Sequence, residues 1–143
     1  MLYDHLIQIG QRLERRASAA AANIAGLSYS ETRLLEALEQ GPQTRAALAQ
    51  NVSLTPSAVS RALRPLEKLG FVTSTRSGRD ARQSHAQLTP AGKERLGHAQ
   101  GAIEEAWQSL DLDTGALSPA DLKAILSQLQ APRPPHFGNR PRG

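Results

Sequence analysis

The sequence predicts a mainly α-helical fold with one small β-hairpin. Apolar residues recur every three or four positions over most of the 143 residues, which is the spacing of amphipathic helices. Three helix starts are marked by a capping hydroxyl directly before a proline, at 55–56, 89–90 and 118–119. The segment 71–76 is instead rich in aromatic and β-branched residues and predicts a strand. A chain of this length can bury a sizeable core.

Composition excludes several classes of protein. No segment approaches the ~20 consecutive apolar residues that span a bilayer, and the first residues lack the pattern of a signal peptide, so we expect a soluble, cytoplasmic protein with no membrane partner. The absence of cysteine excludes disulfides, thiol nucleophiles and cysteine zinc sites. The sequence holds no motif of a serine hydrolase, a nucleotide-binding loop or a zinc protease, and its histidines are not spaced as metal ligands. We therefore expect neither an enzyme nor a metal site or cofactor.

A long amphipathic helix is predicted at the N-terminus, from Leu2 to about Ile24. Its apolar residues fall on one side and its charged residues on the other, and Gly26 follows its end. Ser28 and Glu31 then have the spacing of a capping box, which starts a second helix. The residues of that helix expected to face the core are Leu34, Leu35 and Leu38.

The next two helices are separated by a turn. Thr44 is expected to cap a short third helix over 45–50, and residues 51–54 are expected to form the turn. A fourth helix begins at Pro56, and Gly70 ends it. Its apolar stripe is expected to consist of Val59, Leu63, Leu66 and Leu69.

A β-hairpin is predicted after the fourth helix. Residues 71–76 are expected to pair with 83–88 across a charged loop, which places basic residues at the tip of the hairpin. Two further helices are predicted to begin at Pro90 and Pro119. The segment 131–143 is rich in proline and arginine, has almost nothing to bury, and predicts a disordered basic tail.

Positive charge is concentrated in the middle of the chain. Residues 44–95 contain nine basic and three acidic side chains, a net charge of +6, whereas the remaining eight basic and ten acidic residues give −2. A basic centre between slightly acidic helical ends is typical of a nucleic-acid-binding protein with separate assembly helices. A solvated surface with uneven charge would give the same distribution.

The fourth helix has a polar, basic face opposite its apolar stripe. That face offers hydroxyl, guanidinium and ammonium groups to the major groove of DNA, from Ser57, Ser60, Arg61, Arg64 and Lys68. Arg61 is the candidate for reading a guanine base, while Thr55 and Ser57 suit phosphate. The alternative is an ordinary solvated helix face.

Pro65 interrupts this pattern. It lies inside the predicted helix and removes the hydrogen bond to the carbonyl of Arg61, so we expect a kink between the two residues. The alternative is a break that ends the helix early.

The order of helix, helix, short helix, turn, helix and hairpin is that of a winged helix-turn-helix. Within it stand Thr55-Pro-Ser-Ala-Val-Ser-Arg61, Leu66-Glu-Lys-Leu-Gly-Phe-Val72, Arg79-Asp-Ala-Arg82 and Leu88-Thr-Pro-Ala-Gly92. With these segments in this order, the chain resembles the MarR (multiple antibiotic resistance regulator) family of transcription factors from about residue 2 to residue 130. The resemblance implies a winged helix-turn-helix with N- and C-terminal dimerisation helices.

The resemblance also implies roles at the tip of the hairpin. Arg82 is expected to enter the minor groove of DNA with Asp80 orienting it, while Arg76 and Arg79 contact phosphate. The alternative for Asp80 is a turn residue whose side chain bonds its own backbone. The implied domains are a dimerisation helix over 1–26, a DNA-binding domain over 27–89, dimerisation helices over 90–130 and the tail over 131–143.

The function implied by the resemblance is that of a transcriptional repressor. It would bind a pseudo-palindromic double-stranded operator as a homodimer, and a small-molecule effector would bind near Tyr29 and Trp107. Trp107 has the alternative role of a core anchor, and the end helices have the alternative of packing on their own winged domain. The alternative function is a winged-helix module that contacts proteins and lacks specific DNA binding, and Pro65 slightly favours it.

Overall fold

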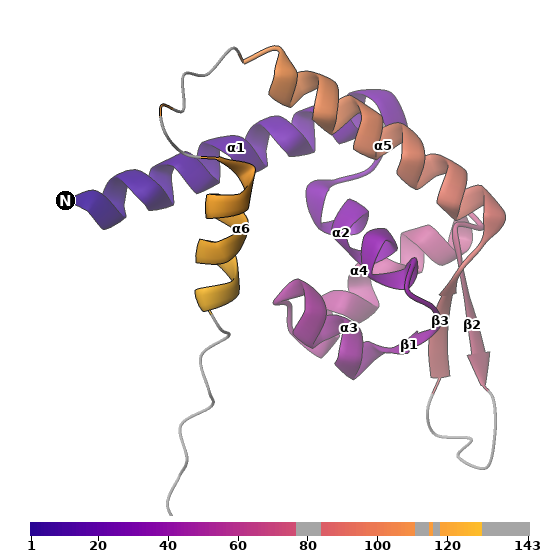
Figure 1. Cartoon of the computed structure of the whole chain (residues 1–143). Helices are drawn as coiled ribbons and strands as arrows, with labels where there is room; N and C mark the ends of the chain where they lie inside the picture. Colours follow the sequence, from indigo (N-terminus) through magenta and orange to yellow (C-terminus); the bar gives the residue numbers. More distant parts are fainter. Residues whose placement is uncertain (77–83, 111–114, 116–117, 130–143) are drawn as a thin grey trace, which may run out of the picture. The chain divides into compact units, whose positions relative to one another are not determined.

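The computed structural model describes residues 1–76, 84–110, 115 and 118–129. Contacts along the chain divide it into two units, Met1–Leu110 and Asp111–Gly143. The first unit holds five helices and a three-stranded sheet, and the second holds one helix in its described part (Figure 1). The mainly helical fold with a small β element is therefore confirmed. Within the described part of the chain, no helix is both long and apolar enough to cross a membrane.

Apart from one short strand before the third helix, the elements follow the predicted order. In chain order they are α1 (Leu2–Ala25), α2 (Tyr29–Leu38), β1 (Gln43–Thr44), α3 (Arg45–Val52), α4 (Pro56–Lys68), β2 (Val72–Arg76), β3 (Ser84–Leu88), α5 (Pro90–Gln108) and α6 (Pro119–Gln128).

The predicted capping residues begin the helices. The hydroxyl of Ser28 accepts a hydrogen bond from the backbone N–H of Glu31, and the Glu31 carboxylate accepts one from the N–H of Ser28. Thr44, Thr55 and Thr89 cap α3, α4 and α5 in the same way, each accepting from the N–H three residues on. These caps satisfy backbone donors that a helix start otherwise leaves without partners.

The turn predicted over 51–54 is shorter than expected. Asn51 and Val52 still belong to α3, because burial of Val52 in the core extends that helix by half a turn. Ser53 ends it with a left-handed backbone (φ 56°), and its N–H donates to the carbonyl of Ala49.

The sheet contains one strand that the sequence did not predict. β2 and β3 pair antiparallel as expected, with Ser74 opposite Ala86, but β1 also pairs with β3 and gives the order β1-β3-β2. A strand of two residues is too short to show a period in sequence. Its pairing ties the start of α3 to the hairpin.

The core lies where α2, α3, α4 and the hairpin meet the end of α1 and the first half of α5. The predicted inward residues of α2 are all buried, and so are Val59, Leu63 and Leu66 of α4. Leu69 was expected in the same stripe, and that prediction is wrong because its side chain is 61% exposed. Leu69 caps the end of α4, and the left-handed Gly70 (φ 77°) turns the chain away there.

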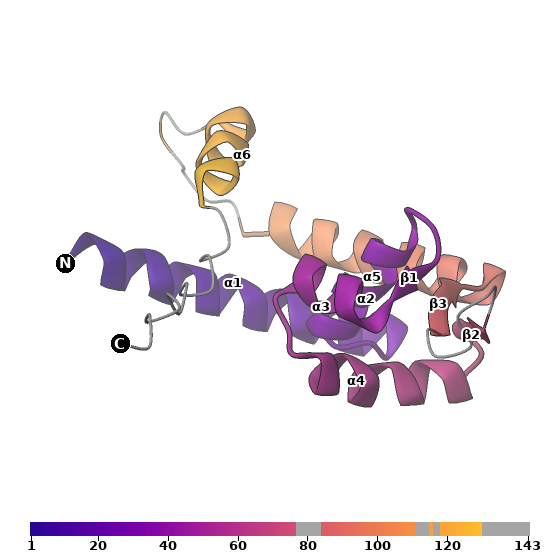
Figure 2. The same cartoon turned by 90° about the horizontal axis from the view of Figure 1, so that it is seen from below.

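The long helix α1 is only partly covered by its own unit. α5 lies alongside α1 in both views (Figures 1 and 2). The buried residues of α1, Ala21 and Ala25, lie in the last two turns of that helix. Apolar side chains along the rest of the helix are exposed, among them Leu2, Leu6, Ile9 and Ile24.

Candidate nucleic-acid interface

The exposed face of α4 gathers the polar and basic residues that the sequence singled out. Arg61, Arg64 and Lys68 are exposed, and no hydrogen bond or ion pair joins them to any residue in the described part of the chain. Free cationic groups in a row on one helix face suit the phosphates and base edges of DNA.

The start of α4 adds hydroxyl groups to this face. Thr55 and Ser57 are exposed, and their hydroxyl oxygens lie 3.2 Å apart. The Thr55 hydroxyl accepts from the N–H of Ala58, and the Thr55 carbonyl accepts from the N–H of Val59. Because Pro56 has no N–H, the N–H of Ser57 is the one that the first turn leaves for an anion. Ser60 is half-buried and therefore less accessible than its neighbours.

α4 continues past Pro65 without a break. The helix runs to Lys68, and the N–H of Leu69 donates to the carbonyl of Pro65 at 3.0 Å. The alternative of a helix that ends early is therefore wrong. Because proline has no N–H, the carbonyl of Arg61 loses its usual helical partner. The kink at this point stays a prediction.

Arg79, Asp80 and Arg82, at the predicted tip of the hairpin, lie outside the described residues. Arg76 ends β2 opposite Ser84. The roles predicted for these four residues stay predictions.

A polar group that sequence reasoning missed joins α4 to the hairpin. The Glu67 carboxylate accepts a hydrogen bond from the Ser74 hydroxyl on β2 and lies 3.7 Å from the Arg45 guanidinium on α3. Arg45 also donates to the hydroxyl of Ser84 on β3, at 2.5 Å. These partners are far apart in sequence, so no local motif indicates them.

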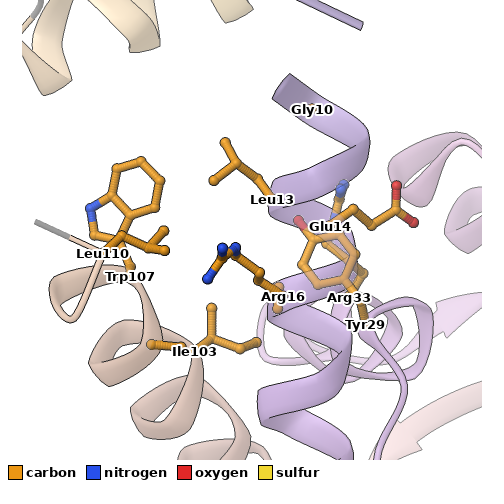
Figure 3. Close-up of a pocket in the computed structure, with 11 residues that line it drawn as sticks. Gly10, Leu13, Glu14, Arg16, Tyr29, Arg33, Ile103, Trp107 and Leu110 are labelled. Carbon is orange, nitrogen blue, oxygen red and sulfur yellow. The ribbon is translucent and has the colours of Figure 1, made fainter. Parts of the chain in front are cut away.

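A pocket of about 470 Å³ lies between α1, α2 and α5 (Figure 3). Tyr29 and Trp107, the two residues predicted near an effector, both line it. Trp107 is 44% exposed, so its side chain is no core anchor within this subunit. Aliphatic residues that sequence reasoning missed complete the apolar lining, namely Leu13, Ala17, Ile103, Ala106 and Leu110.

Two arginines give the pocket a basic side. Arg16 points from α1 toward the α5 side of the pocket, and Arg33 lies by Tyr29 (Figure 3). The Arg33 guanidinium is 6.0 Å from the centroid of the Tyr29 ring, and one of its nitrogens donates to the carbonyl of Asn51 at 3.5 Å. Glu14 also lines the pocket, so an anionic ligand would meet two cations and one carboxylate. Across the described ranges, no group of three or more metal-binding side chains is found.

Comparison with known proteins decides the family. The model of the MarR family matches residues 25–83, the stretch from the end of α1 to the hairpin. The HTH-type transcriptional repressor Rv2887 of Mycobacterium tuberculosis is 33% identical over 102 residues, which cover 71% of this chain and 73% of that protein. The chain belongs to the MarR family. The predicted resemblance is thereby confirmed.

Two solved structures of MarR-family proteins resemble this chain, one in complex with a small molecule and one in complex with DNA. Rv2887 in complex with p-aminosalicylic acid is 30% identical, with a TM-score of 0.69 over 90% of this chain and 98% of that one. Sco3205 of Streptomyces coelicolor, a MarR-family regulator in complex with DNA, is 25% identical, with a TM-score of 0.76 over 89% of this chain and 83% of that one. These relatives are named as regulators of transcription, not as enzymes.

Proposed function

We propose that this MarR-family protein is a cytoplasmic homodimeric repressor that binds a pseudo-palindromic DNA operator and responds to a small aromatic effector. The observation that carries the proposal is the row of exposed cations on α4, Arg61, Arg64 and Lys68, whose side chains have no partner among the described residues. Sco3205, which shares the fold, is seen in complex with DNA. The proposal favours DNA binding over a protein-interaction module because that row is free to meet phosphate.

In this proposal α4 enters the major groove and the hairpin enters the neighbouring minor groove. Arg61 reads a base edge, Thr55 and Ser57 contact phosphate, and Ser60, Arg64 and Lys68 add polar and charged contacts. At the hairpin, Arg82 is assigned to the minor groove with Asp80 orienting it, and Arg76 and Arg79 to phosphate. We assign residues 27–89 to DNA binding and the basic segment 131–143 to sequence-independent attraction.

The dimer in this proposal forms through the ends of the chain, 1–26 and 90–130. The exposed apolar stripe of α1, which includes Leu2, Leu6 and Ile9, needs a cover that its own unit does not provide. In the second unit, α6 likewise exposes the apolar side chains of Leu122, Ile125 and Leu126, and Leu129 directly after the helix is exposed too. A two-fold dimer covers both stripes and sets two recognition helices ~34–36 Å apart, one turn of DNA.

The effector in this proposal is an aromatic molecule with an anionic group. The pocket combines an apolar lining with Tyr29, Trp107, Arg16 and Arg33, so a ring has surfaces to pack on and a carboxylate has guanidinium donors. Rv2887 is seen with p-aminosalicylic acid, which is a ligand of this class.

Selection of bound duplexes from a random pool tests the proposal. The purified protein at near-physiological salt should enrich an inverted repeat with half-sites about one helical turn apart. Arg61→Ala should weaken the discrimination between bases at one base pair of each half-site, and the binding free energies of the preferred and the other bases should become closer by roughly 1–3 kcal/mol. Arg12→Ala, which removes an exposed arginine from α1, is the matched control and should leave the preference unchanged. Salt-sensitive binding without a sequence pattern would contradict the proposal and support the protein-interaction alternative.

A further inference from the structure

Glu67 places a negative charge on the proposed DNA-binding helix. It is the only acidic residue between Thr55 and Arg76, and it lies on α4 together with the exposed Arg61, Arg64 and Lys68. A carboxylate near phosphates weakens DNA binding by repulsion. Its charge alone therefore gives it no favourable role at this face.

The contacts of Glu67 point toward the hairpin instead of toward DNA. One carboxylate oxygen, Oε1, accepts from the Ser74 hydroxyl and lies 3.7 Å from Nη2 of Arg45. The Nη1 atom of the same arginine donates to the Ser84 hydroxyl at 2.5 Å. The two charged side chains are 34% and 31% exposed, so the pair is partly shielded from water and salt. One carboxylate and one guanidinium thus join α3, α4 and both strands of the hairpin.

The register of the strands shows why polar contacts are needed there. Val72 lies opposite Leu88, and Ser74 lies opposite Ala86, so the two pairs share the face that turns toward the helices. Val72 and Ala86 are buried in the core on that face. Further toward the tip, Ser84 continues the same face as a polar residue. Apolar packing therefore ends at Ala86, and the Glu67 and Arg45 contacts take its place.

We propose that Glu67 and Arg45 form a clamp that sets the direction of the hairpin relative to α4, which makes Glu67 a positioning residue for DNA binding. The inference rests on the proposed function. α4 and the hairpin tip must reach neighbouring grooves of one duplex at the same time. If the direction of the hairpin relative to α4 is not fixed, DNA binding must fix it, and the entropy lost in doing so reduces the free energy of binding. Without the clamp, each half-site contact of the tip becomes weaker while α4 still reads its bases.

The substitution Glu67→Gln separates this role from a simple effect of charge. Glutamine keeps an oxygen that can accept from Ser74, but it loses the ion pair with Arg45. If Glu67 acted only through its charge, Glu67→Gln would raise operator affinity, because the substitution removes a negative charge beside the phosphates of DNA. The clamp predicts the opposite sign, a fall of about fivefold, within the range for residues that act through others. Glu94→Gln on α5 is the matched control, since Glu94 is exposed and contacts no charged or hydrogen-bonding partner in the described part of the chain.

A double-mutant cycle with the hairpin tip tests whether Glu67 acts through the hairpin. Operator affinity is measured by fluorescence anisotropy for the full-length wild type, Glu67→Gln, Arg82→Ala and the double variant, with unfolding temperatures recorded for each. Because Arg82→Ala already removes the tip contact, Glu67→Gln should add almost nothing in its presence. Ser84→Ala removes the hydroxyl that accepts from Arg45. It should lower operator affinity as Glu67→Gln does, and this effect too should vanish in the Arg82→Ala background.

The outcomes are distinguishable. A fall in affinity that vanishes in the Arg82→Ala background supports the clamp. A rise in affinity, no change, or a fall that adds fully to that of Arg82→Ala overturns it. If the wild-type protein shows no sequence-specific binding in the first place, the proposed function fails, and the clamp fails with it for that separate reason.

Discussion

The carbonyl oxygen of Phe71 lies against Gly92 so closely that a Cβ atom on Gly92 would be 2.1 Å from it. Thr89, at the start of the same helix, donates its N–H to this oxygen at 3.1 Å and its hydroxyl to the carbonyl of Gly70 at 2.6 Å. Arg95, one turn further along α5, lies 5.2 Å from the centroid of the Phe71 ring and donates to the carbonyl of Ala25 at 3.4 Å. The first turns of α5 therefore fix the point where the chain enters the hairpin.

Gly92→Ala should destabilise the protein by roughly 2 kcal/mol, because backbone atoms must move to admit the methyl group. Gly97→Ala on the same helix is the control, since nothing lies within 4 Å of a Cβ there. It should stabilise the protein by about 0.5–1 kcal/mol, the usual gain for alanine over glycine inside a helix. Urea unfolding followed by circular dichroism measures both. Equal effects of the two substitutions would disprove the close approach.

Leu6→Glu should convert the dimer to a monomer. Leu6 is 58% exposed in the single subunit, and burial of a glutamate in an apolar interface without a partner is strongly unfavourable. Gln8→Glu adds the same charge on the opposite side of α1, so it should leave the dimer intact. Sedimentation velocity at micromolar concentration distinguishes the two states. A Leu6→Glu variant that still sediments as a dimer would remove the α1 stripe from the interface.

An aromatic carboxylate should change the fluorescence of Trp107, the only tryptophan in the chain, because this side chain lines the pocket. With p-aminosalicylic acid as the probe, Arg33→Gln should weaken binding by roughly tenfold, the scale of one lost hydrogen bond to a charged group. The neutral amide of the same acid should bind wild type and variant alike. Arg12→Gln serves as the control for loss of an exposed positive charge. An equal loss for acid and amide would show that Arg33 does not meet the carboxylate.

Helix α6 should lose stability in acid. The side-chain and backbone hydrogen bonds from Ser118 hold the pKa of the Asp121 carboxyl below its ordinary value of 3.8. Because the folded pKa is the lower one, the stabilisation is complete above pH 3.8 and is lost as the pH falls through the folded pKa.

Carbon NMR of the Asp121 carboxyl group measures this titration directly. Ser118→Ala should raise the pKa toward its ordinary value, because it removes the hydroxyl that donates to Asp121. The backbone N–H of residue 118 still donates to the carboxylate, so part of the lowering should remain. Ser127→Ala makes the same change near the other end of α6, where the hydroxyl donates to the carbonyl of Lys123, and should not move it. A titration of Asp121 that Ser118→Ala leaves unmoved would contradict the cap as its cause.

The sequence predicted the features that local chemistry determines. A hydroxyl and a donor three residues on, as at Ser28 and Glu31, make a cap whatever the rest of the chain does, so the helix starts were correct. β1 and the clamp depend on partners brought together by folding: Thr44 pairs with His85, and Arg45 with Glu67. No periodic pattern marks such pairs. The prediction that Leu69 faces the core was wrong for a related reason, because the spacing of apolar residues does not show at which residue the helix ends.

The core cluster draws its fully buried members from residues 21–99, all within one subunit. Closure of the core is therefore a first-order process whose rate is independent of protein concentration, whereas the dimerisation that we propose through α1 is second order. During synthesis, the core can close as soon as α5 has left the ribosome, and assembly then waits for a collision between finished subunits. The number of copies in the cell consequently decides how long a folded subunit remains alone and unable to span both halves of its operator.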